Sequence, residues 1–198
     1  MIRALLFSFS VILALPHASV AQGLASDSET PRPPPRDNTL PRTWWENRAD
    51  GPLWTRVVIA AVETHVRELL STVPKDIADW CPAYAENGPD DRAAFWAGFV
   101  STLARYESTW NPRAVGGNGR WFGLMQIYPP TAEFRDCRVQ TGAGLKRGSD
   151  NLNCAVRIMN ITVPRDTAIS VKATRWRGVA ADWGPIRNDR MRGVMQRY

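Results

Sequence analysis

Apolar residues recur at helical spacing along most of the chain. The first stripe consists of Val58, Val62, Val66 and Leu69-Leu70, which predicts an amphipathic helix that ends before Pro74. The second consists of Phe95, Phe99, Leu103 and Tyr106, which predicts a helix over 90–106. Similar patterns predict helices over 131–137, 149–161, 165–176 and 188–197. No run of alternating residues indicates a sheet. We therefore expect a mainly α, single-domain fold with at most a minor β element.

The N-terminus has the pattern of a secretory signal. Arg3 precedes the apolar run 4–15, and Ser19-Val20-Ala21 supplies small residues at a signal-peptidase site. The apolar run is too short to span a bilayer, which takes about 20 residues. We therefore expect residues 1–21 to be a signal peptide cleaved after Ala21. The mature protein is then periplasmic or secreted, with no stable membrane anchor.

The region after the signal is rich in proline and predicts an extended tether over 22–53. Its densest part is Pro31-Arg32-Pro33-Pro34-Pro35, a composition that is stiff and buries little surface. Trp44-Trp45, inside this range, is a candidate for packing back onto the domain. We expect the folded domain to occupy 54–198.

Composition and net charge limit both the class of protein and the kind of binding partner. The 198 residues are 44% hydrophobic and 22% charged, which excludes a wholly disordered or collagen-like chain. Lys and Arg total 25 against 19 acids, and the net charge of +6 favours acidic partners. Most cations are scattered, which is typical of a solvated surface, and only 187–197 is dense. Export argues against a nucleic-acid partner.

The three cysteines allow one disulfide and one thiol. They are Cys81, Cys137 and Cys154. The pair Cys137–Cys154 closes the shorter loop and is the favoured bridge, although sequence alone leaves the pairing open. The alternative is a zinc site completed by His65. His65 lies beside the apolar stripe of its helix and is more typical of a packing or surface residue, so we expect neither metal nor cofactor.

One segment carries candidate chemistry. Glu107 lies at the end of the long apolar helix over 90–106, and Asn111-Pro112 then stops the helix. Apolar neighbours and the negative end of a helix both favour the protonated carboxyl, which is the form that a general acid requires. The alternative to a catalytic role is that Glu107 is an ordinary exposed glutamate before a turn. A phosphate-binding loop is excluded because the following glycines lack Gly-Lys-Ser/Thr, and no Gly-x-Ser-x-Gly elbow is present.

Two sequence blocks in this region resemble a known family. The first is Glu107-Ser108-Thr109-Trp110-Asn111-Pro112. The second is Gly123-Leu124-Met125-Gln126-Ile127-Tyr128-Pro129-Pro130-Thr131-Ala132. Together they are similar to the catalytic domain of soluble lytic transglycosylases, relatives of goose-type lysozyme. A looser similarity continues through 151–155 to Trp183-Gly184-Pro185, so that the motif core covers 90–187.

The resemblance implies a lysozyme-like fold and cleavage of the β-1,4 bond between N-acetylmuramic acid and N-acetylglucosamine in peptidoglycan. It makes Glu107 the single acid/base of a reaction in which the muramyl residue closes a 1,6-anhydro ring and no water is consumed. Ser108 would support Glu107 or the substrate, and Met125 and Gln126 would line the groove. The partner implied by the resemblance is the peptidoglycan glycan strand. We expect a monomer, and the short domain with its tether adds a cell-envelope secretion or assembly complex as a further candidate partner.

The late part of the motif departs from the family. Many relatives carry Ala-Tyr-Asn-Ala-Gly-Pro, whereas this chain has Ala180-Ala181-Asp182-Trp183-Gly184-Pro185. Trp183 could stack on a sugar or be structural, and Asp182 and Tyr128 are secondary candidates for the site.

Two alternative functions stay open. One is a muramidase that uses water, with Asp182 or Glu133 as its base; Asp136 is a further acid that could fold into the groove. Such an enzyme would use the two carboxyls of a conventional glycosidase. The other is a catalytically weak wall-binding or assembly protein that keeps the groove.

Overall fold

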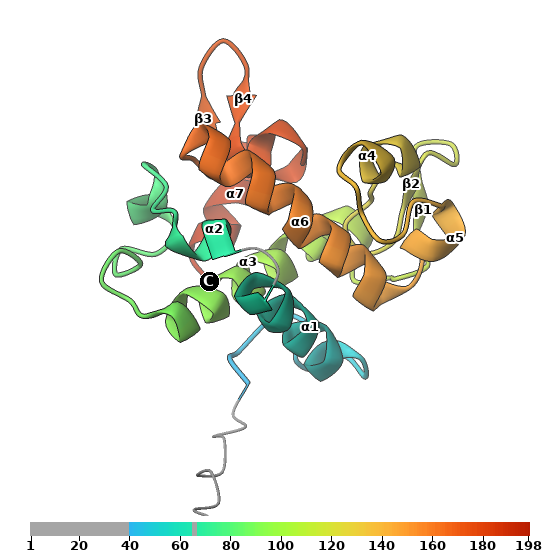
Figure 1. Cartoon of the computed structure of the whole chain (residues 1–198), viewed down its shortest axis with the longest axis horizontal. Helices are drawn as coiled ribbons and strands as arrows, with labels where there is room; N and C mark the ends of the chain where they lie inside the picture. The colour runs from blue at the N-terminus through green and yellow to red at the C-terminus, as the bar shows by residue number, and fades with distance from the viewer. Residues whose placement is uncertain (1–39, 65–66) are drawn as a thin grey trace, which may run out of the picture. The chain divides into compact units, whose positions relative to one another are not determined.

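Three helices that cross one another build the centre of the fold (Figure 1). In the computed structural model, which describes residues 40–64 and 67–198, α1 (Gly51–Thr64) packs on both α3 (Pro89–Ser108) and α6 (Gly148–Asp166). Smaller helices surround them: α2 (Arg67–Ser71), α4 (Pro129–Phe134), α5 (Gly142–Leu145) and α7 (Asp189–Gln196). Short 3-10 turns complete the helical part: η1 (Ile77–Asp79), η2 (Gly178–Ala181) and η3 (Pro185–Arg187).

The helix that matters most for the site is α3, and its ends follow from local sequence. Pro89 occupies its first turn, where a missing N–H costs nothing, and Asp90 and Asp91 face the positive helix end. At the other end Thr109 adopts the left-handed conformation with φ of 55°, and its N–H bonds to carbonyls of the last turn. The prediction of a helix over 90–106 is therefore confirmed.

The stripe predicted as one helix is shared by two elements. Val58 and Val62 are buried on α1, and Leu69 is buried on α2, which ends at Ser71 before Pro74. His65 and Val66 lie outside the described residues. The periodic pattern thus identified the correct buried face of both elements.

The β structure is limited to two short antiparallel pairs in the described residues. In the first, β1 (Val115–Gly116) pairs with β2 (Trp121–Phe122). In the second, β3 (Val171–Lys172) pairs with β4 (Trp176–Arg177), and Figure 1 shows this hairpin projecting from the end of α6. The prediction of a mainly α fold with a minor β element is confirmed.

The second hairpin corrects the helix predicted over 165–176. The α6 helix ends at Asp166, and Thr167 turns the chain with φ of 47°. The Asp166 carboxylate accepts the backbone N–H of Gly178 (2.7 Å), which ties the return strand to the end of the helix. Gly178 itself has φ of +65° and lies against the Ala168 carbonyl, where a Cβ would not fit. These non-local contacts override the helical spacing.

The folded unit begins earlier than Trp54. The described residues 40–64 and 67–198 belong to one compact unit, and Trp45 is fully buried, with its indole N–H donating to Thr55 Oγ1 (2.8 Å). The Trp44 backbone N–H donates to Ser101 Oγ (3.0 Å) on α3. The described end of the predicted tether, residues 40–53, is therefore part of the fold. The predicted signal peptide and residues 22–39 lie outside the described residues.

A disulfide joins Cys137, just after α4, to Cys154 on α6. This is the pair that the sequence analysis favoured, and it leaves two of the three sulfurs unable to serve a zinc site. Cys81 is the free thiol and is half-buried. Residues 40–64 and 67–198 contain no group of three or more His, Cys, Asp or Glu side chains placed to hold a metal ion. None of the helices in these ranges has the length and apolarity needed to cross a membrane.

Candidate active site

Glu107 lies in the last turn of α3 with its side chain half-buried. Burial disfavours the carboxylate and raises the pKa of Glu107 to about 7, while the nearby charge of Arg187 acts in the opposite direction. Among the described residues, none donates a hydrogen bond to the Glu107 carboxyl. A carboxyl that is half protonated near neutral pH is suited to give and take a proton.

The raised pKa of Glu107 predicts a stability that depends on pH. The unfolded chain releases this proton near pH 4.5 and the folded chain near 7, so stability due to Glu107 is present below 4.5 and lost as pH rises through 7. We expect Glu107→Gln to remove this loss and to raise the free energy of unfolding at pH 8 by about 2–3 kcal/mol. Urea unfolding of both proteins at pH 4 and pH 8 measures the effect. A gain that is equal at both pH values would contradict the raised pKa.

The chain turns sharply after Glu107, as Asn111-Pro112 predicts. Thr109 and Trp110 both have positive φ, and the Trp110 indole N–H donates to Ser101 O (2.9 Å), which fixes the turn against α3. The Asn111 side chain then accepts the N–H of Arg113 (2.9 Å). This rigid exit from the helix holds the backbone beside Glu107 in one conformation.

The Ser108 hydroxyl forms no hydrogen bond with the Glu107 carboxyl in the described part of the chain. Its hydroxyl donates to Ala104 O (3.3 Å), one turn back in α3, and its side chain is half-buried. Tyr128, the other polar candidate close to the motif, precedes α4 and is 42% exposed. Its ring is available to a ligand, whereas the Ser108 hydroxyl is engaged by the helix.

The second sequence block forms a buried turn that is held from below by α6. The Met125 side chain is fully buried, and its N–H donates to Asn151 Oδ1 (2.8 Å). Gly123 has φ of +79° and packs so closely on Asn151 that no Cβ would fit. Met125 is thus a core residue, which corrects the expectation that its side chain lines a groove.

Gln126 differs from Met125 because its side chain is half-buried at the edge of the same turn. Its amide donates to Gly123 O (2.9 Å) and Ala114 O (3.4 Å), so it connects the turn to the loop before β1. Gln126 therefore joins the second sequence block to the loop that follows the first, and it keeps part of its surface open.

Trp183 is buried and does not present its ring to a ligand. Its side chain is 4% exposed, and its indole N–H donates to Met125 O (2.9 Å). Of the two roles that the sequence left open, the structural one fits this position. Trp183 anchors the late motif to the turn over 123–127, so the two parts of the site are fixed to each other.

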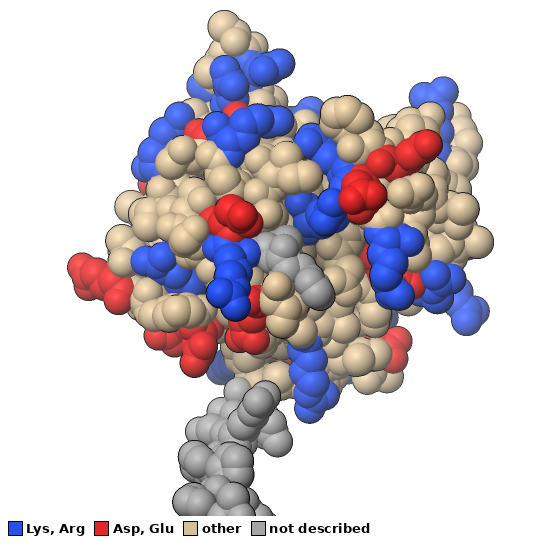
Figure 2. Space-filling model, viewed as in Figure 1, with Lys and Arg blue, Asp and Glu red and all other residues tan. Residues whose placement is uncertain are grey.

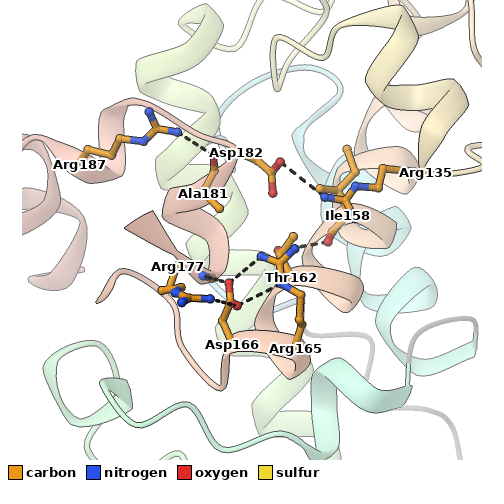
Figure 3. Close-up of polar contacts among 10 residues, drawn as sticks. Arg135, Ile158, Thr162, Arg165, Asp166, Arg177, Ala181, Asp182 and Arg187 are labelled. Carbon is orange, nitrogen blue, oxygen red and sulfur yellow. Dashed lines mark hydrogen bonds and ion pairs between the residues drawn. The ribbon is translucent and has the colours of Figure 1, made fainter. Parts of the chain in front are cut away.

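The other candidate carboxyls differ in their surroundings. Glu133 is exposed on α4, and the Asp136 side chain is 86% exposed and paired with Arg157 (2.8 Å). The Asp182 side chain is only 22% exposed and points toward Arg135, 3.9 Å away (Figure 3). Burial raises the pKa of Asp182, while the charges of Arg135, Arg165 and Arg187 oppose that rise. Asp182 is therefore the candidate second carboxyl.

Arg187 is a site residue that the sequence analysis did not single out. Its Nε and Nη2 donate to Ala180 O and Ala181 O, each at 2.7 Å, and its charge lowers the pKa of both Glu107 and Asp182. The one available signal was its place at the start of the dense basic stretch 187–197. Its role depends on η3 (Pro185–Arg187) packing against α3, which sequence spacing does not reveal.

Part of the chain, including Glu107 and the turn over 123–127, matches a known protein family. Residues 87–173 match the sequence profile of the Transglycosylase SLT domain, a range that holds Glu107 and both sequence blocks. The chain contains an SLT transglycosylase domain. Its resemblance to lytic transglycosylases and its lysozyme-like fold are confirmed. The SLT domain includes α6 and β3, whereas Asp182, Trp183 and Arg187 lie beyond the matched range.

Solved structures of DslA (Bd0314), a Bdellovibrio protein, are similar to the whole folded unit. The wild-type form has a TM-score of 0.73 and 26% identity, and the match covers 80% of this chain and 94% of that chain. Two variants, each with one glutamate changed to glutamine, give TM-scores of 0.74 at 26% identity and 0.72 at 25% identity. They cover 80% and 79% of this chain and 94% of theirs. No curated protein matches the chain.

Proposed function

We propose that this protein is a peptidoglycan lytic transglycosylase in which Glu107 is the single acid and base. The observation that supports it is the half-buried Glu107 carboxyl within the SLT domain, whose pKa is raised to about 7 by burial. A pKa close to neutral allows one group to be protonated before bond cleavage and to accept a proton afterwards. The positive net charge of +6 would assist approach to a polymer that carries carboxylates.

In the proposed reaction Glu107 first acts as an acid. It donates its proton to the oxygen that links N-acetylmuramic acid to N-acetylglucosamine, and the bond between that oxygen and C1 breaks. Glu107, now a carboxylate, accepts the proton of the muramyl C6 hydroxyl while the C6 oxygen bonds to C1. The products are a free N-acetylglucosamine end and a 1,6-anhydro ring, and Glu107 is protonated again.

A hydrolytic muramidase is the second candidate, and the surroundings of Asp182 support it. Asp182 is largely buried, and Arg187 influences its pKa as well as that of Glu107. An enzyme with two such carboxyls could activate water with one and protonate the leaving oxygen with the other. The exposed Glu133 has no comparable surroundings.

The mass of the products distinguishes these two reactions. Purified protein is incubated with peptidoglycan sacculi, and the soluble fragments are analysed by mass spectrometry. The proposed reaction gives fragments lighter than the hydrolysed products by one water molecule, because the anhydro ring retains no water. Fragments with hydrated reducing ends would contradict the proposal and identify a hydrolytic muramidase. In that case Asp182→Asn would be expected to abolish activity. Sacculi that bind the protein but stay intact would support the wall-binding alternative.

The site of action is part of the same proposal. Peptidoglycan lies outside the cytoplasm, and residues 1–21 carry the pattern of a secretory signal. We propose that the protein works in the periplasm or after secretion. N-terminal sequencing of the protein recovered from the cell envelope would begin at Gln22.

A further inference from the structure

A pocket rich in cations lies between the β3–β4 hairpin, the end of α6 and the late motif. Its volume is about 520 Å³, and its wall contains Arg165, Lys172, Arg175, Trp176, Ala181 and Arg187. Figure 2 shows Lys and Arg side chains gathered around the hairpin, at the top of that view. None of the residues that line this pocket is acidic.

Much of this positive charge is not neutralised inside the protein. Asp166 lies below the pocket with its side chain 1% exposed, and it pairs with Arg165 (2.7 Å) and Arg177 (3.4 Å), as Figure 3 shows. Lys172 and Arg175 form no ion pair within residues 40–64 and 67–198. Arg165 and Arg187 also lie close enough to the largely buried Asp182 carboxylate to influence its pKa, so the unpaired charge on the open side of the pocket is that of Lys172 and Arg175.

The pocket adjoins the candidate acid through Arg187. This side chain is fixed by Ala180 O and Ala181 O, which are neutral acceptors, so its charge remains free to act on its surroundings. It forms part of the pocket wall, and the turn that carries it packs on α3, the helix whose last turn contains Glu107. Its effect on the pKa of Glu107 is further support for their closeness. A ligand in the pocket would thus contact Arg187, the residue whose charge acts on Glu107.

The wall also has an apolar part. Lys172 Nζ lies 5.2 Å from the centre of the Trp176 ring, and the Arg192 guanidinium lies 5.9 Å from it, so cations flank an aromatic surface. This combination suits an anion that is carried on an aliphatic or peptide backbone. A small inorganic ion would use the charges but not the ring.

We infer that this pocket binds a carboxylate of the peptide stem attached to the glycan strand that Glu107 cleaves. This inference rests on the proposed function, because the stem must enter together with its strand. Lys172 and Arg175 would provide the ion pairs, and Trp176 would contact the stem beside the carboxylate. The pocket would then select strands that carry peptide and position them against Glu107.

Binding of a soluble muropeptide tests the inference without any cleavage. The full-length protein is titrated calorimetrically with a disaccharide peptide whose carboxylates are free, and with the same compound after conversion of those carboxylates to amides. We expect the free acid to bind about tenfold more tightly, which two partly exposed ion pairs can supply. Lys172→Gln combined with Arg175→Gln should abolish this preference, and Lys172→Arg combined with Arg175→Lys should keep it.

The matched control removes the same charge from elsewhere on the surface. Arg56 and Lys146 are exposed and do not line the pocket, so Arg56→Gln combined with Lys146→Gln should retain the tenfold preference. Equal affinities for acid and amide in the wild type would overturn the inference, as would loss of the preference in the control. Inorganic phosphate that binds as tightly as the free acid would also overturn it, because the pocket would then be a general anion site. Failure of the proposed function appears separately, as sacculi that stay uncut.

Discussion

Glu107→Gln is expected to reduce the release of fragments from sacculi roughly a thousandfold, the range that loss of a general acid produces. The glutamine amide has nearly the same shape as the carboxyl but can neither donate a proton to the glycosidic oxygen nor accept one from the C6 hydroxyl. Substrate binding should persist, so the loss should appear in kcat rather than in the fraction of protein bound to sacculi. Turbidity of a sacculus suspension measures the rate, and sedimentation with sacculi measures binding.

The matched control for this change is Glu86→Gln. Glu86 is exposed in the turn before α3, and Glu86→Gln makes the same chemical change at a position away from the candidate site. The control should keep the wild-type rate. Glu107→Gln protein that still digests sacculi within a few-fold of wild type would show that another group supplies the proton. A rate that declines above pH 7 in the wild type is expected too, because the protonated form of Glu107 is then lost.

Asn151→Ala should lower the free energy of unfolding by about 3 kcal/mol, because it removes hydrogen bonds to three backbone groups, of which Phe122 O alone keeps another partner, the Ile127 N–H. Asn151 is fully buried on α6; its Oδ1 accepts the Met125 N–H (2.8 Å). Its Nδ2 donates to Phe122 O (2.9 Å) and Leu145 O (3.0 Å). One side chain thus joins the second sequence block, β2 and α5. Urea unfolding measures the loss, and the melting temperature should fall by about 10 °C.

Asn153→Ala provides the comparison on the same helix. Asn153 is half-buried and makes one long bond, from Nδ2 to Ser149 O (3.4 Å), so its removal should cost less than about 0.5 kcal/mol. Equal losses for the two variants would show that the network around Asn151 adds no stability beyond an ordinary helix position. Because the turn over 123–127 lies beside the candidate site, Asn151→Ala should also reduce activity at temperatures where the protein remains folded.

The arrangement of the late motif explains how this chain accommodates its departure from the family pattern. Trp183 fills the core and its indole N–H donates to Met125 O, whereas Asp182 is largely buried beside Arg135. The short side chain of Ala181 lines the cationic pocket, and Arg187 is fixed by the carbonyl of the same residue. The change from the family pattern therefore combines a larger core residue with a more highly charged wall.

Local signals in the sequence were sufficient for several features of this protein. The stripe of Phe95, Phe99 and Leu103 defines the buried face of α3, and Asn111-Pro112 accounts for the chain turning after it. Glu107 could be placed at the end of an apolar helix because that position depends on residues within one or two turns. The direction of its pKa shift could be expected from the same neighbours, but the burial that raises the pKa to about 7 is a property of the folded chain. The two sequence blocks were enough to indicate the SLT family.

The tertiary structure alone decided the features that depend on distant partners. Trp183 and Met125 are core residues because α6 and the late motif enclose them, and Trp45 belongs to the fold because Thr55 accepts its indole N–H. The hairpin over 171–177 replaces a predicted helix because Asp166 holds its return strand. Burial and charge at a residue depend on what the rest of the chain brings next to it, and helical spacing contains no information about those neighbours.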